Sequence, residues 1–466
     1  MKMWAGRFRQ PLDPEFERWQ RSFPFDQRLI GEELAASRAH ARALASAGVL
    51  SQAELESILR GLEQLGEQAA NPEFLHDDDA EDVHHFVEKQ LVALIGETGY
   101  KLHSGRSRNE QIATDLRLYV RGSIDTLQRG LGELLEALVA RAEKSGVAAM
   151  PSYTHLQPAE PVLVAHWLLA YAEMFFRDSG RLADCRKRLN QCPLGSGAVA
   201  GATLPLDRTA MAADLGFDAP TANSLDATSD RDFAIEFVQA LSVLAVHFSR
   251  LAEEMILFST REFGFVRLPE PFSTGSSAMP QKQNPDAMEL VRGKAARVIG
   301  DAAALIVTVK GLPLAYNKDL QETQEPVFSA AETMQAVVSI AAEFLSAVEF
   351  DYDRMHAAAG SGFMNAMAAA HYLVARGVPF RRAHEQIGQA VQWCVENHCE
   401  LADMPLDDLR RFAPEAEQDF YSHLTLDAVL ACHDVEGGTA PMRVRQALAE
   451  ARERLAALRG EQHAHA

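Results

Sequence analysis

Apolar positions in the middle of the chain recur at intervals of three and four residues over unusually long stretches. Between Ile112 and about Lys144 they are Leu116, Val120, Ile124, Leu127, Leu131, Leu134 and Leu138. No proline interrupts this stretch, so the spacing predicts one helix of roughly 50 Å, at about 1.5 Å per residue. A helix of that length needs other long helices to cover its apolar stripe.

Four later segments show the same helical spacing. They cover approximately 161–190, 230–258, 285–310 and 325–356. The alternation of apolar and polar residues that is typical of strands is almost absent, and glycine and proline gather in the connections. The sequence therefore predicts an all-α fold with a central bundle of five long helices.

Shorter helical segments flank this predicted bundle on both sides. The spacing is short up to about Ser107, and after about Ala358 it is interrupted by Pro379, Pro405, Pro414 and Pro441. We therefore expect three regions: an N-terminal helical domain at 1–107, the long-helix bundle at 108–357 and a C-terminal helical domain at 358–466.

The composition restricts the possible partners. With 45 Lys and Arg against 65 Asp and Glu in 466 residues, the formal charge is −20, which opposes non-specific binding to nucleic acid. No run of 18 apolar residues and no apolar leader is present, so we expect no membrane association. Five cysteines without a CxxC pair suit reduced thiols, and the expected location is the cytoplasm.

The sequence gives little support for a metal or a cofactor. The acidic run at 77–82 precedes a helical pattern that begins at Val83, so we interpret it as helix caps rather than a cation site. Nothing near His84 and His85 in the sequence completes a set of zinc ligands. Gly195, Gly197 and Gly201 follow no strand, which argues against a dinucleotide-binding turn. We expect neither a metal nor a cofactor.

The segment at 274–286, with the sequence TGSSAMPQKQNPD, joins a loop of small residues to a predicted helix start. Asn284 suits the N-cap position and Pro285 the first helical position, so Lys282 comes just before the helix N-terminus. Backbone amides, the positive end of a helix and an ammonium group together favour a carboxylate or a developing oxyanion. We therefore predict a small anionic substrate.

Two more polar segments adjoin the predicted long helices. They are HSGRSRNEQ at 103–111 and SYTHLQP at 152–158. Taken singly, each is as readily explained by a capping turn as by a binding site. Their interest comes from the fact that three such segments lie at ends of long helices.

The loop pattern GSSxMPxKxNP resembles the signature of the fumarase/aspartase superfamily. Gln281, between the proline and Lys282, is similar to the pattern of argininosuccinate lyases, because fumarases and aspartases place glycine there and adenylosuccinate lyases place histidine. Further blocks carry the same resemblance along essentially the whole chain: WAGRF at 4–8, EDVH at 81–84, LGSG at 194–197, NSLD at 223–226, SDRD at 229–232, AYNKDLQE at 315–322 and GGTAP at 437–441.

This resemblance implies an elimination that releases arginine and fumarate from argininosuccinate. It implies that Ser276 removes the Cβ proton, with its oxyanion favoured by the loop amides and Lys282. His155 would relay or donate a proton, and Thr154 would contact the leaving group. Asn284 would hold the substrate carboxylate beside Lys282. Cleavage of the Cα–N bond would complete the reaction.

The resemblance also implies the residues that bind substrate and the assembly that completes the site. The expected contacts are Ser22, His84, Arg108, Asn109, Tyr316 and Gln321. The fold implied is a helical bundle that packs into a larger bundle in a homotetramer. Each active site would then draw its segments from three subunits.

Two departures from the family pattern affect the expected contacts. Gln324 stands where the family usually has a lysine, in a segment that begins Gln321-Glu322-Thr323, so a charged substrate contact is replaced by a neutral one. The segment 362–371 lacks the acidic positions common in the family. Two alternatives stay open: another fumarate-releasing lyase such as an adenylosuccinate lyase, or a non-catalytic structural protein similar to lens crystallins.

Overall fold

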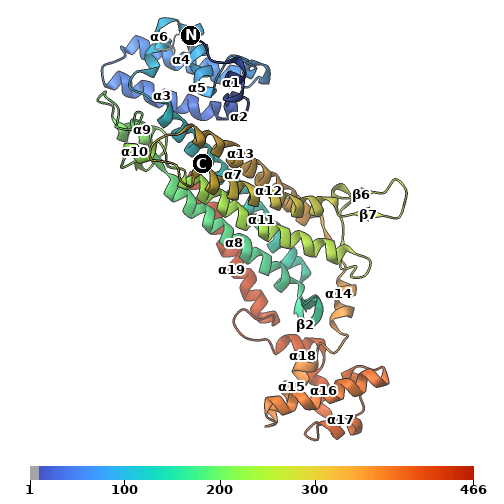
Figure 1. Cartoon of the computed structure of the whole chain (residues 1–466). Helices are drawn as coiled ribbons and strands as arrows, with labels where there is room; N and C mark the ends of the chain where they lie inside the picture. The colour runs from blue at the N-terminus through green and yellow to red at the C-terminus, as the bar shows by residue number, and fades with distance from the viewer. Residues whose placement is uncertain (1–9, 466) are drawn as a thin grey trace. The chain divides into compact units, whose positions relative to one another are not determined.

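The computed structural model describes residues 10–465, and the predicted WAGRF block at 4–8 lies outside them. The fold is all-α (Figure 1). The five long helices in the middle of the chain are α7 (Arg108–Ser145), α8 (Val164–Leu189), α11 (Asp232–Ser259), α12 (Asp286–Val309) and α13 (Gln324–Ala347). The predicted central helices are confirmed, because the long apolar stripes in the sequence do form continuous helices.

The described chain divides into two compact units. The first unit comprises residues 10–126, 180–242 and 296–334, and the second comprises 127–179, 243–295 and 335–465. Each long helix contributes residues to both units. The expected domain boundaries near residues 107 and 357 differ from this division and remain a prediction.

The first unit contains the short helices that precede the bundle. These are α1 (Pro14–Trp19), α2 (Phe23–Asp26), α3 (Ile30–Ser46), α4 (Gln52–Ala69), α5 (Val83–Ile95) and α6 (Glu97–Tyr100), with α9 (Arg208–Asp214) and α10 (Ser224–Ala227) following α8. Local sequence explains several starts. Ser51 and Glu54 form a capping box on α4, and Asp82 caps α5 by accepting from the His85 amide at 2.8 Å.

Within the first unit, aromatic and cationic side chains join the long helices. The Tyr119 ring meets Phe328 edge-on at 4.9 Å, which links α7 to α13. The Arg117 guanidinium lies 4.4 Å above the Phe233 ring of α11. These contacts fix the packing around the start of α7, where several of the predicted substrate contacts are found.

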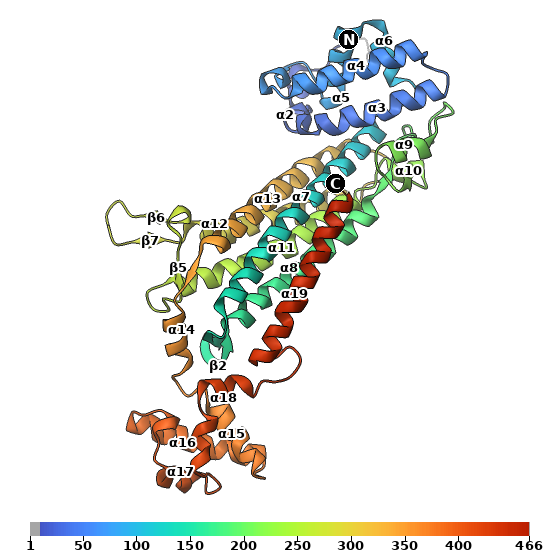
Figure 2. The same cartoon turned by 180° about the vertical axis from the view of Figure 1, so that it is seen from behind.

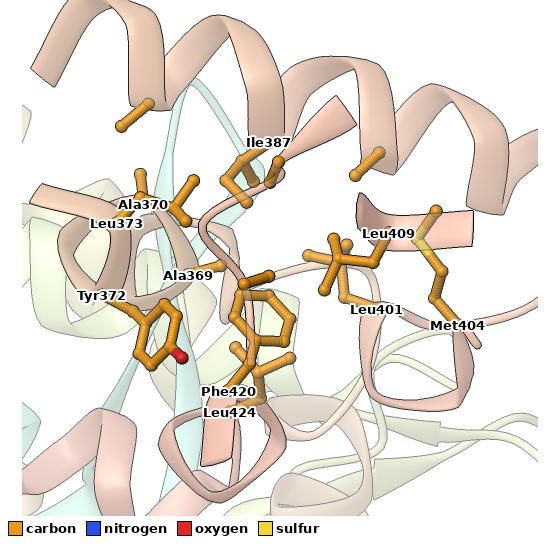
Figure 3. Close-up of a cluster of buried hydrophobic side chains, with 14 of the residues drawn as sticks. Ala369, Ala370, Tyr372, Leu373, Ile387, Leu401, Met404, Leu409, Phe420 and Leu424 are labelled. Carbon is orange, nitrogen blue, oxygen red and sulfur yellow. The ribbon is translucent and has the colours of Figure 1, made fainter. Parts of the chain in front are cut away.

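The second unit contains the remaining helices, drawn in orange and red at the C-terminal end of the chain in Figures 1 and 2. They are α14 (Tyr352–Ala359), α15 (Ala366–Ala375), α16 (Phe380–Asn397), α17 (Leu406–Phe412), α18 (Leu426–Ala431) and α19 (Pro441–His465). Helices α15–α17 enclose their own apolar core. In Figure 3 the side chains of Leu373, Ile387, Leu401, Leu409 and Phe420 converge on it.

The strands are short and occur in pairs. They are β1 (Ala149–Thr154) with β2 (Gln157–Leu163), β3 (Gln191–Cys192) with β4 (Ala219–Pro220), β5 (Val266–Arg267) with β8 (Glu349–Phe350) and β6 (Thr274–Gly275) with β7 (Gln283–Asn284). All pairs are antiparallel except β3 with β4. Each pair joins segments that connect helices, and the fold class remains all-α.

Two predicted helix limits are wrong. The helix expected from residue 161 begins at Val164, because 161–163 belong to β2. The helix expected to run to residue 356 ends at Ala347, because Glu349 and Phe350 pair with β5 and Asp351 then caps α14 through the Arg354 amide at 3.1 Å. Both errors arise where pairing with a distant segment overrides a local helical pattern.

Among the described residues, helix α11 alone is long and apolar enough to cross a membrane by length and composition. Its contacts are those of a core helix. In the second unit Phe248 packs 4.7 Å from Phe175, and Glu254 accepts hydrogen bonds from Trp167 at 2.6 Å and Tyr171 at 2.7 Å. Glu254, which is partly buried, thus links α11 to α8.

Candidate active site

Ser22 caps α2, where its backbone binds a residue just before α5 and its side chain binds the last residue of α2. Its amide donates to the Glu81 carbonyl at 2.9 Å, and its hydroxyl donates to Asp26 at 2.6 Å. Asp26 in turn accepts from the Val83 amide at 3.0 Å. These bonds place Ser22 beside the EDVH segment at 81–84 that was predicted to contribute to the site.

Arg108 is the first residue of α7 and pairs with the residue that caps α5. Its Nη1 lies 2.8 Å from Oδ2 of Asp82. Burial, together with the nearby Asp82 carboxylate, raises the pKa of the Asp26 carboxyl to about 7. A carboxyl with a raised pKa therefore lies near Asp82, the partner of the predicted substrate-binding arginine.

Other predicted contacts of the first unit come from the segment before α13 and from α7. Gln321 donates to the Gln20 carbonyl at 3.1 Å, while the Asn109 amide donates to the Ala198 carbonyl at 3.4 Å. Burial raises the pKa of Tyr316, which the neighbouring Arg231 guanidinium lowers in part. The charges of Arg108 and Asp82 also act on Tyr316, so this residue belongs to the same neighbourhood.

Gln324 begins α13 and is almost completely buried. It is 2% exposed, and its side-chain carbonyl oxygen has no hydrogen-bond partner among the residues that the structure describes. An unpartnered buried acceptor is costly, and such groups often mark binding sites. The family position that usually carries a cation is thus occupied here by a buried neutral amide.

A cavity of about 240 Å³ adjoins Arg108 in the first unit. Its lining includes both cationic and anionic side chains, with Arg21 and Arg108 facing Asp78 and Glu81. Lys318 lies 3.6 Å from Glu81. A ligand that carries carboxylates and a guanidinium would find groups of opposite charge for both in this cavity.

His84 belongs to a buried cluster that the sequence analysis did not foresee. Its Nδ1 lies 2.9 Å from Oε2 of Glu33 on α3 and 3.5 Å from Oδ2 of Asp115 on α7. One ligand atom from each of the three residues lies within 4.8 Å of the others. The three side chains include the donor types that hold divalent metals, although no sequence spacing suggested this.

The loop that carries Ser276 and Lys282 connects β6 to β7 in the second unit. Figures 1 and 2 both show it projecting away from the helices of that unit. The Ser276 hydroxyl oxygen accepts from the Ala278 amide at 3.3 Å and the Met279 amide at 3.1 Å. The loop therefore directs backbone donors at the oxygen where the predicted base would carry negative charge. The Lys282 side chain is exposed.

The helix start after this loop differs from the prediction. Helix α12 begins at Asp286, and the carbonyl of Pro285 accepts the first helical bond, from the Glu289 amide. Asn284 donates its side-chain amide to the Thr274 hydroxyl at 3.3 Å. Its predicted role as the N-cap is wrong, because β6–β7 pairing holds Asn284 in a strand.

Thr154 and His155 lie at the turn between β1 and β2. His155 and Leu156 both have positive φ, 55° and 58°, and Thr154 pairs with Gln157 across the turn. This is a two-residue hairpin turn built from residues other than glycine, which costs about 1 kcal/mol or more per residue. Thr154 and His155 are both exposed. A strained, exposed turn is a frequent setting for a functional side chain.

The structure gathers some of the predicted residues and leaves others apart. Ser22, His84, Arg108 and Tyr316 meet around the starts of α5 and α7 in the first unit. Within the second unit, no hydrogen bond or ion pair among the described residues joins His155 to the 274–286 loop. Sequence analysis missed Asp26, Glu33 and Asp115, although an acidic residue within an apolar helical stripe was an available signal.

The segment 362–371, which lacks the family's acidic positions, receives a carboxylate from elsewhere in the second unit. The amides of Gly362 and Phe363 donate to Glu400 at 2.9 and 3.3 Å. Phe363 also packs against the core shown in Figure 3. The packing of this segment is therefore satisfied without acidic residues of its own.

Comparison with known families covers most of the chain. A model described as a lyase family matches residues 6–300, and one described as argininosuccinate lyase C-terminal matches residues 363–431. The argininosuccinate lyase of Koribacter versatilis is 63% identical, with 100% of both chains covered. That of Acidobacterium capsulatum is 59% identical over 96% of this chain and 93% of its own.

Solved structures show the same fold. An EDDS lyase variant with bound fumarate has a TM-score of 0.84 at 25% identity, covering 98% of this chain and 92% of its own. A 3-carboxy-cis,cis-muconate lactonizing enzyme from Pseudomonas putida has a TM-score of 0.73 at 22% identity, over 95% of this chain and 100% of its own. At that identity the second likeness concerns the fold alone.

Proposed function

Because the chain belongs to the argininosuccinate lyase family, we propose that it is a carbon–nitrogen lyase that splits argininosuccinate into arginine and fumarate. The observation that carries this proposal is the 63% identity that extends over the whole of both chains. The reaction would serve arginine biosynthesis, and the expected location is the cytoplasm.

In the proposed mechanism Ser276 removes the Cβ proton next to a substrate carboxylate. A serine hydroxyl is a weak base, so its oxyanion must be stabilised by its surroundings. The Ala278 and Met279 amides that donate to its oxygen support this role. Lys282 supplies a positive charge on the same loop, and Asn284 would contact the same carboxylate.

His155 and Thr154 would act on the leaving group. After the Cβ proton has been removed, the Cα–N bond breaks and the electron pair goes to the guanidinium nitrogen, which must gain a proton. His155 would relay or donate that proton, while Thr154 contacts the departing group. Their exposed position on a strained turn supports a role outside core packing.

Substrate binding would depend on the residues gathered in the first unit. Arg108 would bind a carboxylate through its planar guanidinium, with Asn109 and Ser22 beside it. Tyr316 and Gln321, from the segment before α13, and Gln324, its first residue, would line the same site. The cavity of mixed charge next to Arg108 supports an anionic substrate that also carries a guanidinium.

We further propose that the protein is a homotetramer whose active sites combine segments of three subunits. The exposure of His155 and Lys282 supports this, because neither is enclosed by residues of its own unit. Helix α12 also exposes apolar side chains: Leu290, Ile299, Ile306 and Val307. Exposed large apolar residues on a long helix are typical of a surface that another chain covers.

The test is a fumarate-release assay followed by ultraviolet absorbance. Argininosuccinate, adenylosuccinate, aspartate and malate are offered in parallel at equal concentration. We expect release from argininosuccinate alone. Release from adenylosuccinate instead would assign the chain to a different lyase reaction, and release from none of the four would indicate a structural protein.

A further inference from the structure

Glu33, His84 and Asp115 form an almost completely buried cluster, here called the carboxyl–histidine cluster. Their exposures are 1%, 3% and 0%. The three residues come from α3, α5 and α7, so the cluster joins three helices of the first unit. Burying two carboxyl groups and one imidazole is costly unless each charge is balanced and each proton is shared with an acceptor.

Glu33 is surrounded by donors. Ser37 donates to its Oε1 at 2.6 Å, and Gln111 donates to both of its oxygens at 3.1 Å. His84 contacts its Oε2 at 2.9 Å, and the Arg106 Nη2 lies 3.8 Å from Oε1. These are the partners of an ionised carboxylate.

Asp115 has the opposite surroundings. Among the described residues no group donates a hydrogen bond to either of its oxygens, and its Oδ2 is 3.5 Å from Nδ1 of His84. The charged and titratable groups that act on it are Glu32 and Glu33 of α3, His84 of α5 and Arg106 before α7. A second carboxylate would face Glu33 without donors of its own, which is strongly unfavourable.

We propose that Asp115 is a neutral carboxylic acid that donates its proton to the Glu33 carboxylate, and that it serves as a positioning residue for His84 and the start of α7. One proton then turns two competing acceptors into a donor and an acceptor. Glu33 keeps its negative charge, which the Arg106 guanidinium balances. The positioning role rests on the proposed function, whereas the protonation of Asp115 does not.

The electrostatic surroundings agree with this distribution of charge. Burial raises the pKa of Asp115 well above its usual value, and the Glu33 carboxylate raises it further. Burial also opposes ionisation of Glu33, but the charges of Arg106 and His84 outweigh it and lower the Glu33 pKa. Opposite shifts in two adjacent carboxyls are the sign of one shared proton.

A divalent metal is a poorer occupant of the carboxyl–histidine cluster than a proton. The distance of 2.9 Å between His84 and Glu33 is that of a direct hydrogen bond. Gln111 and Ser37 already occupy the Glu33 oxygens, and the Arg106 guanidinium adds a positive charge close by. A metal would have to displace these donors and overcome that charge.

The cluster lies directly behind the predicted substrate contacts. His84 follows Asp82, the partner of Arg108, by two residues on α5. Asp115 follows Arg108 by two turns on α7. A hydrogen bond from Asp115 to Glu33 joins α7 to α3, and the contact of His84 with Glu33 joins α5 to α3. Together the two bonds would fix the relative positions of the helix starts next to Arg108 and Asp82.

The direct test is infrared spectroscopy of the full-length protein, unlabelled and with isotope-labelled aspartate. Because the Asp26 carboxyl, with a pKa of about 7, would contribute a band of its own, the spectra are recorded in an Asp26→Asn background. We expect the carbonyl band of a protonated carboxylic acid at neutral pH, shifted by the label and lost when Asp115→Asn is added. Asp125→Asn is the matched control, because Asp125 is on the same helix but accepts from Arg186 at 2.6 Å. That variant should keep the band. Absence of the band from the Asp26→Asn protein would overturn the proposal.

The second measurement is chemical unfolding as a function of pH. A raised pKa means that the folded state keeps a proton that the unfolded chain releases above about pH 4, so stability falls as pH rises beyond that point. Asp115→Asn, which is always neutral, should remove this part of the decline. An Asn variant whose pH dependence equals that of the parent would contradict the proposal.

Kinetics then test the positioning role. Asp115→Asn can still donate to Glu33, so kcat and KM should stay within about tenfold of the parent. Asp115→Leu cannot donate, and KM should rise by roughly tenfold or more, beyond any change in kcat. If the Asn variant loses as much as the Leu variant, or if the purified protein holds one metal ion per chain that Asp115→Asn removes, Asp115 acts as an anion and the proposal fails.

Discussion

The predicted substrate contacts around Arg108 and the predicted catalytic residues of the two loops differ in how far the chain itself holds them in place. Ser22 and Arg108 bind to Asp26 and Asp82, which lie around the start of α5. His155 and Lys282 are exposed on a hairpin turn and a projecting loop. The chain thus preorganises the substrate-binding residues. The proposed catalytic residues would gain their remaining contacts from other subunits or from the substrate.

The largest effect should come from the exposed loop. Ser276→Ala should lower kcat by at least about 10²-fold, since it removes the proposed proton acceptor. Its stability should change by less than about 0.5 kcal/mol, because the hydroxyl lies outside the core. Steady-state kinetics and thermal unfolding measure both. Ser277→Ala, at the exposed neighbouring position, should retain near-parental activity. Equal losses in the two variants would exclude Ser276 as the base.

Mixing inactive variants tests whether the exposed catalytic residues of one site come from different subunits. If subunits share sites, mixing inactive Ser276→Ala protein with inactive His155→Asn protein should restore part of the activity once subunits exchange. Some sites would then receive both intact segments. Native mass spectrometry monitors the exchange, and each variant mixed with itself is the control. Exchange without recovered activity would mean that one chain supplies both groups.

The residues held in place around Arg108 should make the stability of the protein depend on pH. The Asp26 pKa of about 7 lies above its usual value of 3.8, so the folded state holds an extra proton between these limits. The free energy of unfolding should therefore fall as pH rises from about 4 to 7, and Asp26→Asn should remove the part of that fall that comes from Asp26. Urea unfolding at several pH values tests this. Asp79→Asn, whose side chain is 91% exposed, should leave the pH dependence unchanged.

A smaller effect is expected at Gln324, a buried residue of the predicted substrate site that stands where the family usually has a lysine. Gln324→Lys should lower KM for argininosuccinate several-fold at low salt, about 1 kcal/mol for a charged contact, with less gain as salt rises. Because the position is 2% exposed, the unliganded variant should also lose some stability, and substrate should restore it. Gln324→Met is the control, because it removes the amide without adding a charge. A KM that does not fall at any salt concentration would show that neighbours have replaced the missing cation.

The same contrast explains what the sequence could predict. The Asp82 cap and the long helix α7 follow from residues close together in the chain, so local rules predict them. The position of Asn284 depends on pairing between β6 and β7, and local capping rules misassign it. Glu33 and Asp115 are 82 positions apart, and only the packing of α3 against α7 brings them together. The signal available was an acid three residues after Ile112, within an apolar stripe.

The carboxyl–histidine cluster also constrains how this sequence can change over time. Removing Glu33 leaves Arg106 without its counter-charge, and removing His84 takes a donor from Glu33. Each single change therefore passes through a less stable protein, with a buried group left unpaired. Substitutions at positions 33, 84 and 115 should arise together in diverging lineages, or be confined to residues of the same hydrogen-bonding type.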